Sequence, residues 1–331
     1  MIVTLTMNPS VDRTATLPGP LTVGGVNRIA SVDDAPGGKG VNVTRVLAAG
    51  GVPTTAVFPA PTGDPFVAMC RDADIPVTVV PATTGVRVNL TVTDPDGTTT
   101  KLNEPGATPA PAALDALGDT LDELAGRARW MVLCGSLPRG VPDDFYADLV
   151  VRLRSTGARV AVDTSDAPLA ALASHLPAAA PDLVKPNGEE LGQLAGVDGV
   201  ELERRAANGY LDPIIATATG LRERGLGTAL ITLGGAGAVL VDDDEVWHAR
   251  SGPVRVRSTV GAGDSSLAGY LLAESHGLPP RERLAWAVAH GATAASLDGT
   301  GLPLGLDPTG VEVTLTRLDR SPQPHTDEGR P

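Results

Sequence analysis

The run Ser258-Thr259-Val260-Gly261-Ala262-Gly263-Asp264-Ser265 places two glycines and a carboxylate at the start of a predicted helix. Apolar residues at 267–272 follow at helical spacing, and residues 255–257 before it are expected to end a strand. Glycines at such a turn let a ligand reach backbone N–H groups, and a helix N-terminus attracts anions. Asp264 there suits a base that takes a proton from a hydroxyl attacking a phosphoryl group. Taken alone, the segment suits a helix-capping role for Asp264 equally well.

A second glycine-rich turn, Pro36-Gly37-Gly38-Lys39-Gly40-Val41-Asn42-Val43, also opens a predicted helix. Free N–H groups beside the mobile cation of Lys39 suit a phosphate, with Gly38 at the turn itself. The spacing differs from the GxxxxGK[ST] pattern of a Walker A loop. Asn42, in the first helical turn, suits either a bond to a sugar hydroxyl or a local cap.

Polar residues also follow predicted strands. Asp12 comes after the first strand, and we expect it at the carboxyl edge of the sheet, where ligands bind and a carboxylate can hold two sugar hydroxyls. Arg87 and Asn89 share one face of a predicted hairpin strand, from which the arginine could close over a substrate phosphate. Ser136 and Arg139 follow another strand and could line the same edge. The alternatives are that Asp12 is a solvated turn residue, that Arg87 is an exposed charge on a strand, and that Ser136 and Arg139 lie in a plain turn.

A further strand is followed by Lys185-Pro186-Asn187-Gly188-Glu189-Glu190. Asn187 and Glu190 lie three residues apart on one helical face, which suits contact with a hydrated Mg²⁺ through water. A capping box explains the same spacing equally well. Small residues that leave room for nucleotide phosphates end the next strand, at Thr232, Gly234, Gly235 and Gly237.

The elements that must position these residues alternate between strands and helices, which predicts an α/β fold with a mainly parallel sheet covered on both faces. Strands are expected at residues 2–7, 55–58, 77–80, 130–134, 159–162, 183–184 and 229–233, with a hairpin at 239–241 and 246–249. Helices are expected at residues 41–49, 66–72, 110–125, 143–155, 189–195 and 211–224.

Two segments break this alternation, at about residues 12–34 and 85–104. The second alternates polar and apolar residues around the turn Asp94-Pro95-Asp96-Gly97, which indicates a hairpin. We expect both segments to form a small β-sheet lid within a single domain over residues 1–320. The polar, proline-rich residues 321–331 are expected to form a disordered tail.

The composition of the chain argues against several classes of protein. The chain has 331 residues and a formal net charge of −13, which argues against nonspecific nucleic-acid binding. A signal peptide and a membrane span are not expected, because the N-terminus lacks a basic region and no apolar run is long enough. The two cysteines, Cys70 and Cys134, form no zinc or disulfide pattern. We therefore expect a soluble, cytoplasmic protein.

Taken in order, the motifs resemble those of the ribokinase-like (PfkB) family of carbohydrate kinases. The segments GGKGVNV and TVGAGDS match its two signatures, and the resemblance covers about residues 1–305. The segments TLTMNPSVDRT, PGGKGVNV, VRVNLTV followed by LNEPG, GSLPRG and KPNGEEL resemble the 1-phosphofructokinase and tagatose-6-phosphate kinase branch. The family implies a three-layer α/β/α fold in which a small β-sheet lid covers the active site.

The resemblance also implies roles for individual residues. Asp264 matches the catalytic base, and the turn at Gly261, Ala262 and Gly263 matches the anion hole. Positions for the phosphosugar are Asp12, Gly38, Lys39, Asn42, Arg87, Asn89, Ser136 and Arg139. Positions for ATP are Lys185, Asn187, Thr232, Gly234, Gly235, Gly237, Thr259, Gly261 and Gly263. Asn187 and Glu190 match residues that reach Mg²⁺ through water.

The implied reaction is ATP-dependent phosphorylation of a ketohexose phosphate, with fructose 1-phosphate as the first choice. Tagatose 6-phosphate or fructose 6-phosphate is the alternative, and a sugar-phosphate sensor without catalysis is the alternative outside enzymes. The family also implies a homodimer formed through the lid.

The sequence departs from the branch pattern at Gly85, where threonine is common, at Ser266, where methionine is common, and at Asp166, where glycine is expected. Residues 197–227 also form a longer segment than usual. These departures bear on nucleotide fit and substrate choice.

Overall fold

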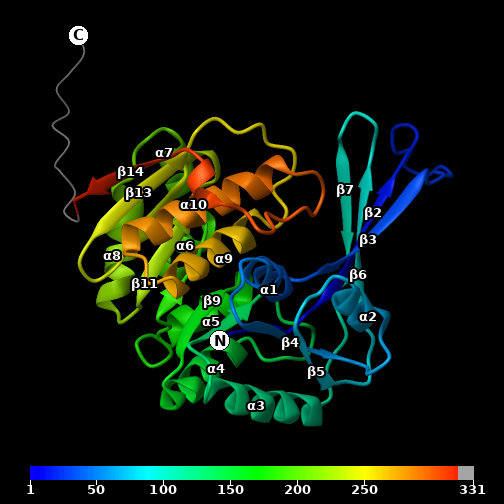
Figure 1. Cartoon of the computed structure of the whole chain (residues 1–331), viewed down its shortest axis with the longest axis horizontal. Coiled ribbons are helices and arrows are strands. Elements are labelled where there is room, and N and C mark those ends of the chain that lie inside the picture. The colour runs from blue at the N-terminus through cyan, green and yellow to red at the C-terminus, as the bar shows by residue number, and fades with distance from the viewer. Residues whose placement is uncertain (320–331) are drawn as a thin grey trace.

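The computed structural model of the chain describes residues 1–319, which form a ten-stranded sheet and a separate four-stranded sheet (Figure 1). The predicted tail at residues 321–331 lies outside the described part. The large sheet has the order β14-β13-β12-β11-β10-β9-β8-β1-β4-β5. Its strands are β1 (Ile2–Thr6), β4 (Thr54–Ala60), β5 (Val77–Pro81), β8 (Trp130–Cys134), β9 (Arg159–Asp163), β10 (Leu183–Val184), β11 (Thr228–Thr232), β12 (Ala238–Val241), β13 (Val246–Ser251) and β14 (Val313–Leu318).

The seven strands from β11 to β5 pair in parallel, and β12, β13 and β14 extend that sheet as antiparallel edge strands. This arrangement confirms the predicted mainly parallel sheet with an appended hairpin. Because parallel strands end at one edge, the loops after β1, β8, β9, β10 and β11 meet on the same side of the molecule.

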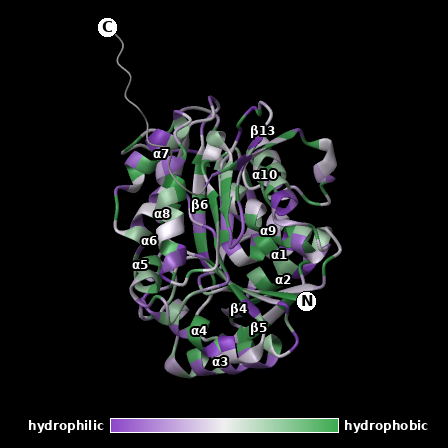
Figure 2. Ribbon diagram, turned by 90° about the vertical axis from the view of Figure 1, so that its left-hand side faces the viewer, coloured by the Kyte–Doolittle hydropathy of each residue, from purple (hydrophilic) through white to green (hydrophobic). Residues whose placement is uncertain are grey.

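Helices cover both faces of the large sheet. They are α1 (Lys39–Ala49), α2 (Pro65–Asp72), α3 (Pro111–Ala125), α4 (Phe145–Leu153), α5 (Asp166–Ser174), α6 (Gly188–Ala195), α7 (Gly199–Ala207), α8 (Asp212–Glu223), α9 (Ala262–Ser275) and α10 (Pro280–Ser296), with short 3-10 helices η1 (Arg154–Thr156), η2 (Gly234–Ala236) and η3 (Pro308–Gly310). Strand residues alternate between the faces: Ile2 packs with α1, α9 and α10, whereas Val3 packs with α3 and α4. Figure 2 shows hydrophobic residues gathered towards the middle and hydrophilic ones on outer helices such as α3 and α7.

The small sheet has the order β3-β2-β6-β7, from β2 (Ser10–Thr16), β3 (Ser31–Gly37), β6 (Arg87–Thr93) and β7 (Thr99–Asn103). β6 and β7 are the predicted hairpin, and Gly97 at its turn has a φ of 89°. β2 and β6 pair in parallel, so Asp12 stands opposite Asn89. Asp12 was expected at the edge of the large sheet. It lies instead within β2, because the small sheet begins directly after the loop that leaves β1.

The predicted strand ending at residues 255–257 is wrong. β13 ends at Ser251, and the following segment turns towards α10, where the Arg257 N–H donates to the carbonyl of Ala295 at 2.8 Å. β14 occupies the sheet position beside β13. Helices α5, α7 and α10 and strand β14 were not predicted. The long segment at residues 197–227 contains the additional helix α7 followed by α8.

Candidate active site

Asp264 lies in the first turn of α9 and is 7% exposed. Gly261 is the N-cap residue directly before α9; its φ of 74° is strained for other residues, and no side chain caps the helix. Asn42 on α1 donates from Nδ2 to Asp264 Oδ2 at 2.9 Å. Asn42 therefore orients the carboxylate of Asp264, and α1 has no side-chain cap. The turn leaves helix N–H groups and one carboxylate together at the same place.

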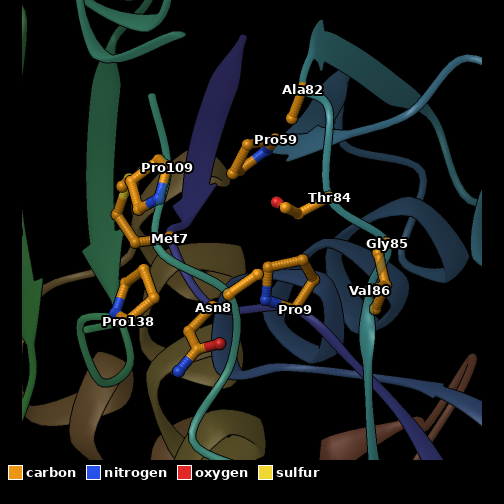
Figure 3. A pocket seen from close by; sticks show the side chains of 11 residues that line it. Met7, Asn8, Pro9, Pro59, Ala82, Thr84, Gly85, Val86, Pro109 and Pro138 are labelled. Carbon is orange, nitrogen blue, oxygen red and sulfur yellow. The ribbon is translucent and has the colours of Figure 1, made fainter. Parts of the chain in front are cut away.

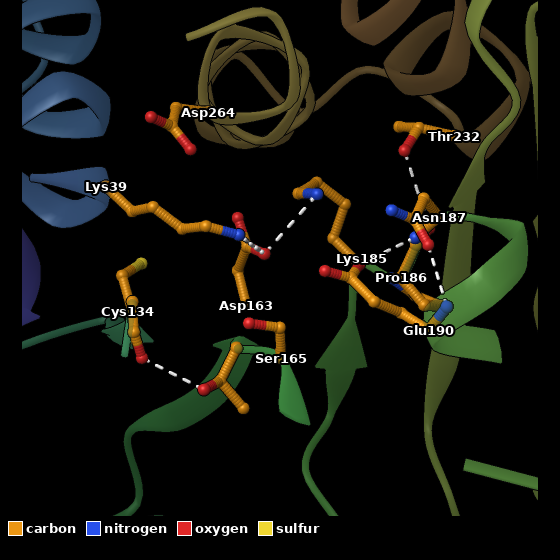
Figure 4. A network of polar contacts seen from close by, with 12 residues as sticks. Lys39, Cys134, Asp163, Ser165, Lys185, Pro186, Asn187, Glu190, Thr232 and Asp264 are labelled. Carbon is orange, nitrogen blue, oxygen red and sulfur yellow. Dashed lines mark hydrogen bonds and ion pairs between the residues drawn. The ribbon is translucent and has the colours of Figure 1, made fainter. Parts of the chain in front are cut away.

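A buried acid that sequence reasoning left without a role lies beside Asp264. Asp163 ends β9, and its Oδ1 is 2.8 Å from Lys39 Nζ and 3.4 Å from Lys185 Nζ (Figure 4). Its Oδ2 is buried and has no hydrogen-bond partner among the described residues. The available signal was its place at the carboxyl end of a predicted buried strand, where ligand-binding groups gather.

The charges of this cluster shape its chemistry. Burial raises the pKa of Asp264 to about 6, with Asp163 adding to the rise while Lys39, Asn42 and Lys185 oppose it. Burial also disfavours the charged form of Asp163, but Lys185 and Lys39 outweigh it and lower the pKa of Asp163. Likewise, the carboxylates around Lys39 outweigh its burial, so its pKa is raised. Asp264 can thus accept a proton near neutral pH while Asp163 and Lys39 stay charged.

Lys185 is 4% exposed and reaches the start of α9, since a Cβ on Gly263 would lie 3.2 Å from Lys185 Nζ. The family resemblance implies a phosphosugar for Lys39 and a nucleotide for Lys185. The structure brings both ammonium groups to one carboxylate, Asp163, below the N-terminus of α9. Figure 4 shows the two side chains reaching Asp163 from opposite sides, and the Lys185 ammonium group near the start of α9 is suited to stabilise a phosphoryl group in transfer.

A second cluster lies on the polar face of the small sheet. Asn89 Nδ2 donates to Ser10 Oγ at 3.0 Å and to Asp12 Oδ1 at 3.2 Å, and the Ser10 hydroxyl also donates to Asp12. Burial raises the pKa of Asp12. Arg87 donates to the carbonyls of Glu104 and Asn8 at 2.7 and 3.2 Å. The buried Arg87 Nε and Asn89 Oδ1 have no partner in the described chain and remain available to a ligand.

Gly37 makes room for Asp12. A Cβ on Gly37 would lie 2.3 Å from the Asp12 Cγ. At Gly38, φ is 114°, and a Cβ would lie 2.7 Å from Thr6 Cγ2. The glycines before Lys39 thus allow β3 and α1 to approach the Asp12 carboxylate and the end of β1 closely.

Near Lys185 of the first cluster, Asn187 and Glu190 form the capping box of α6. Asn187 Oδ1 accepts the Glu190 N–H at 2.7 Å, and Glu190 Oε2 accepts the Asn187 N–H at 2.8 Å. Burial raises the pKa of Glu190, with Lys185 and Lys39 opposing it. The second carboxylate oxygen of Glu190 takes no part in the box, so capping leaves it able to face a hydrated cation.

Thr232 ends β11 and pairs with Asn187 across an isolated bridge, which brings the glycine loop beside the capping box. A Cβ on Gly234 or Gly235 would meet open space, whereas one on Gly237 would lie 2.0 Å from the Ala249 carbonyl oxygen. The first two glycines therefore leave space for a ligand, and the third permits the close turn into β12.

The remaining candidates lie nearer the surface. Asn8 Nδ2 approaches Ser136 Oγ at 3.4 Å, next to the carbonyl that Arg87 contacts. Arg139 and Thr259 are exposed. The Thr259 carbonyl accepts the Ala262 N–H at the start of α9 at 3.4 Å.

A small pocket lies beside the second cluster, at the carboxyl ends of β1, β4 and β5 (Figure 3). Its lining is mainly proline and small apolar side chains, with Asn8 and Thr84 as polar members and Gly85 at its rim. No lining residue is ionisable, so the pocket lacks the groups that the polar clusters offer for proton transfer.

Within residues 1–319 no group of three or more His, Cys, Asp or Glu side chains could hold a metal ion directly. A cation held mostly by water still fits the free Glu190 oxygen beside Asn187, because hydrated Mg²⁺ needs few protein ligands. The helices of the described part include none with the length and hydropathy to cross a membrane.

Comparisons with known proteins show which family the chain resembles over most of its length. Residues 5–305 match the family model described as pfkB family carbohydrate kinase. The chain is 38% identical over 308 residues to a 1-phosphofructokinase of Rhodobacter capsulatus, covering 91% of this chain and 92% of that one. It is 36% identical over 274 residues to a 1-phosphofructokinase of Xanthomonas campestris, covering 82% and 83%. The crystal structure of Escherichia coli phosphofructokinase-2 with substrates and products superposes with a TM-score of 0.80 at 29% identity, covering 94% of this chain and 97% of that one.

Proposed function

The chain belongs to the pfkB family of carbohydrate kinases, and from that premise we propose that it phosphorylates fructose 1-phosphate with ATP, giving fructose 1,6-bisphosphate and ADP. The observation that carries the proposal is the buried Asp264 at the uncapped start of α9, with its pKa raised to about 6. A carboxylate so placed takes a proton from a hydroxyl while the helix N–H groups hold a phosphoryl group.

In the proposed reaction, Asp264 accepts the proton of the sugar 6-hydroxyl as that oxygen bonds to the γ-phosphorus. The bond from the γ-phosphorus to the bridging oxygen breaks, and ADP leaves with that electron pair. The N-terminus at Gly261, Ala262 and Gly263, together with Lys185, stabilises the charge on the transferring group. Because the transition state is loose, positioning and charge stabilisation contribute more than proton removal.

The small sheet holds the sugar in this proposal. Asp12 and Asn89 face the secondary hydroxyls, and the free Asn89 Oδ1 supports that assignment. Arg87 and Lys39, with Gly38, Ser136 and Arg139 around them, bind the phosphate already on the sugar. Asn42 donates to Asp264 and so orients the base.

ATP extends along the loops after β11 and before α9. The open space at Gly234 and Gly235 receives its phosphates, with Thr232, Gly237 and Thr259 bordering them. When bound, Mg²⁺ neutralises charge on the β- and γ-phosphates. Glu190, with the carboxylate oxygen that the capping box leaves free, and Asn187 would face it through water.

We further propose that two copies pair through their small sheets. Val32 and Leu102 are 48% and 58% exposed, and Leu90 stands opposite Leu102 on the same face. This face is opposite to the one that carries Asp12 and Asn89, because strand residues alternate. A second small sheet would bury these side chains without blocking the sugar cluster.

A cytoplasmic location is proposed as well. Cys70 and Cys134 are buried free thiols, which suits a reducing compartment.

Steady-state kcat/KM with MgATP, measured separately on fructose 1-phosphate, fructose 6-phosphate and tagatose 6-phosphate, tests the substrate. We expect fructose 1-phosphate to be preferred. Preference for either 6-phosphate would replace the substrate while keeping the chemistry. Turnover of unphosphorylated sugars alone would refute the phosphate-binding roles of Lys39 and Arg87, and binding of a phosphosugar without ATP consumption would indicate a sensor.

A further inference from the structure

The additional helix α7 contributes a carboxylate to the start of α6, where Asn187 and Glu190 lie. Glu203 Oε1 accepts the Gly188 N–H at 3.1 Å. A Cβ on Gly188 would lie 2.3 Å from Glu203 Cγ, so the glycine admits this side chain. The first turn of α6 is thereby held by two independent contacts, its own capping box and a residue of the next helix.

The two helices approach backbone to backbone. A Cβ on Gly192 of α6 would lie 2.4 Å from the Gly199 Cα, and a Cβ on Gly199 would lie 2.5 Å from the Glu189 Cα. Such contact leaves little freedom for Glu203 to move relative to α6.

α7 also supports the glycine loop. Leu202 and Ala206 are buried in one hydrophobic cluster with Leu233, and Ala236 packs against it. Glu203, between these two residues, lies on a helix that contacts both the glycine loop and the start of α6.

The starts of α6 and α9 therefore differ in chemistry. At α9 no side chain caps the helix, which leaves donors for an anion. At α6 the N–H groups of Asn187, Gly188 and Glu190 all donate to side-chain oxygens. The carboxylates that fill this end favour a cation nearby rather than a phosphate.

We infer that Glu203 is a positioning residue for the nucleotide: by holding Gly188 it fixes the first turn of α6 and, through it, the direction in which Glu190 and Asn187 face the metal-bound phosphates. This inference rests on the proposed function. It assigns to α7 a task in binding MgATP and none in binding the sugar, whose cluster lies on the small sheet.

Isothermal titration of the full-length protein with MgADP tests the inference without relying on turnover. We expect Glu203→Ala to weaken MgADP binding about tenfold, the loss typical when a residue that orients a metal-facing group is removed. Glu203→Gln keeps an acceptor oxygen for the Gly188 N–H and should stay within about twofold of the unmodified chain. The KM for fructose 1-phosphate should be unchanged in both variants.

Glu201→Ala is the matched control, because Glu201 lies on the same helix and its carboxylate pairs at the surface with Arg204 and Arg205. Gly188→Ala is a second route to the same effect, since its Cβ displaces Glu203 without removing the carboxylate. Unchanged MgADP affinity in Glu203→Ala and Gly188→Ala would overturn the inference, as would a Gln variant as weak as the Ala variant. If the unmodified chain itself binds no MgADP, the proposed function fails instead.

Discussion

Replacing Asp264 with asparagine should slow turnover strongly and at the same time increase the free energy of unfolding at pH 8. Asparagine keeps the size of the side chain and an oxygen that can accept from Asn42 Nδ2. It removes a charge that burial disfavours, while Lys39 and Lys185 keep Asp163 as a partner.

The magnitude follows from the pKa of Asp264, about 6 in the folded chain against the ordinary 3.8. Because the folded pKa is raised, the folded state binds the proton more tightly, and the free energy of unfolding falls as pH rises from the unfolded pKa to the folded one. A gap of about two pH units, at about 1.4 kcal/mol each, costs about 3 kcal/mol at pH 8. At pH 4.5 Asp264 in the folded state is mostly protonated, and the same relation gives a cost to the free energy of unfolding of about 1 kcal/mol.

Urea unfolding of the wild type and Asp264→Asn at pH 8 and pH 4.5 measures both values. kcat should fall by about 10²- to 10⁴-fold, the range for a lost general base. Asp115→Asn on the exposed surface of α3 is the control, expected within about 0.5 kcal/mol of wild type at both pH values.

Three results would refute this reasoning. An asparagine variant less stable than wild type at pH 8 would mean that the carboxylate is stabilised where it lies. A gain in stability that is equal at both pH values would mean that the ionisation of Asp264 is not its cause. A kcat that barely changes while binding collapses would make Asp264 a structural cap.

Three further outcomes follow from the same geometry. The kcat/KM should fall about tenfold from pH 7 to pH 5 as Asp264 protonates near pH 6, and a flat acid limb would contradict its role as base. Gly37→Ala should displace the Asp12 carboxylate and raise the KM for fructose 1-phosphate about tenfold or more while the KM for MgATP is unchanged; an equal rise in both would point to misfolding. Asp166→Gly should raise the free energy of unfolding by about 0.5–1 kcal/mol in urea titration, since Asp166 has a φ of 57°, and a loss of stability would show that its side-chain contacts outweigh the backbone strain.

Sequence reasoning located those parts of the molecule whose signals are local. The turn at Gly261 and the hairpin around Gly97 could be predicted because both turns need a residue with positive φ, and glycine adopts that conformation easily. The expectation of glycine at position 166 also agrees with the left-handed backbone found there, although this chain carries aspartate.

What could not be predicted depends on pairing across the fold. Asn42 suggested only local or ligand-binding roles, because nothing nearby reveals that its amide donates to Asp264. The role of Asp163 becomes visible only in the fold, where Lys39 from α1 and Lys185 after β10 both pair with its carboxylate. The error at residues 255–257 has the same origin. The sequence of this segment resembles a strand, but the Arg257 N–H bonds to the Ala295 carbonyl of α10 and not to a neighbouring strand.

The packing of α1 against α9 has a consequence for how the protein is made. Asn42 and Asp264 are 222 residues apart in the chain, and Val43 and Leu47 of α1 are buried with Leu267 and Leu271 of α9. While the chain is being synthesised, this face of α1 stays uncovered until α9 has emerged, because domains fold as units. Premature termination before α9 therefore exposes an apolar surface on the large sheet, and such fragments are expected to aggregate rather than to accumulate as partly active enzyme.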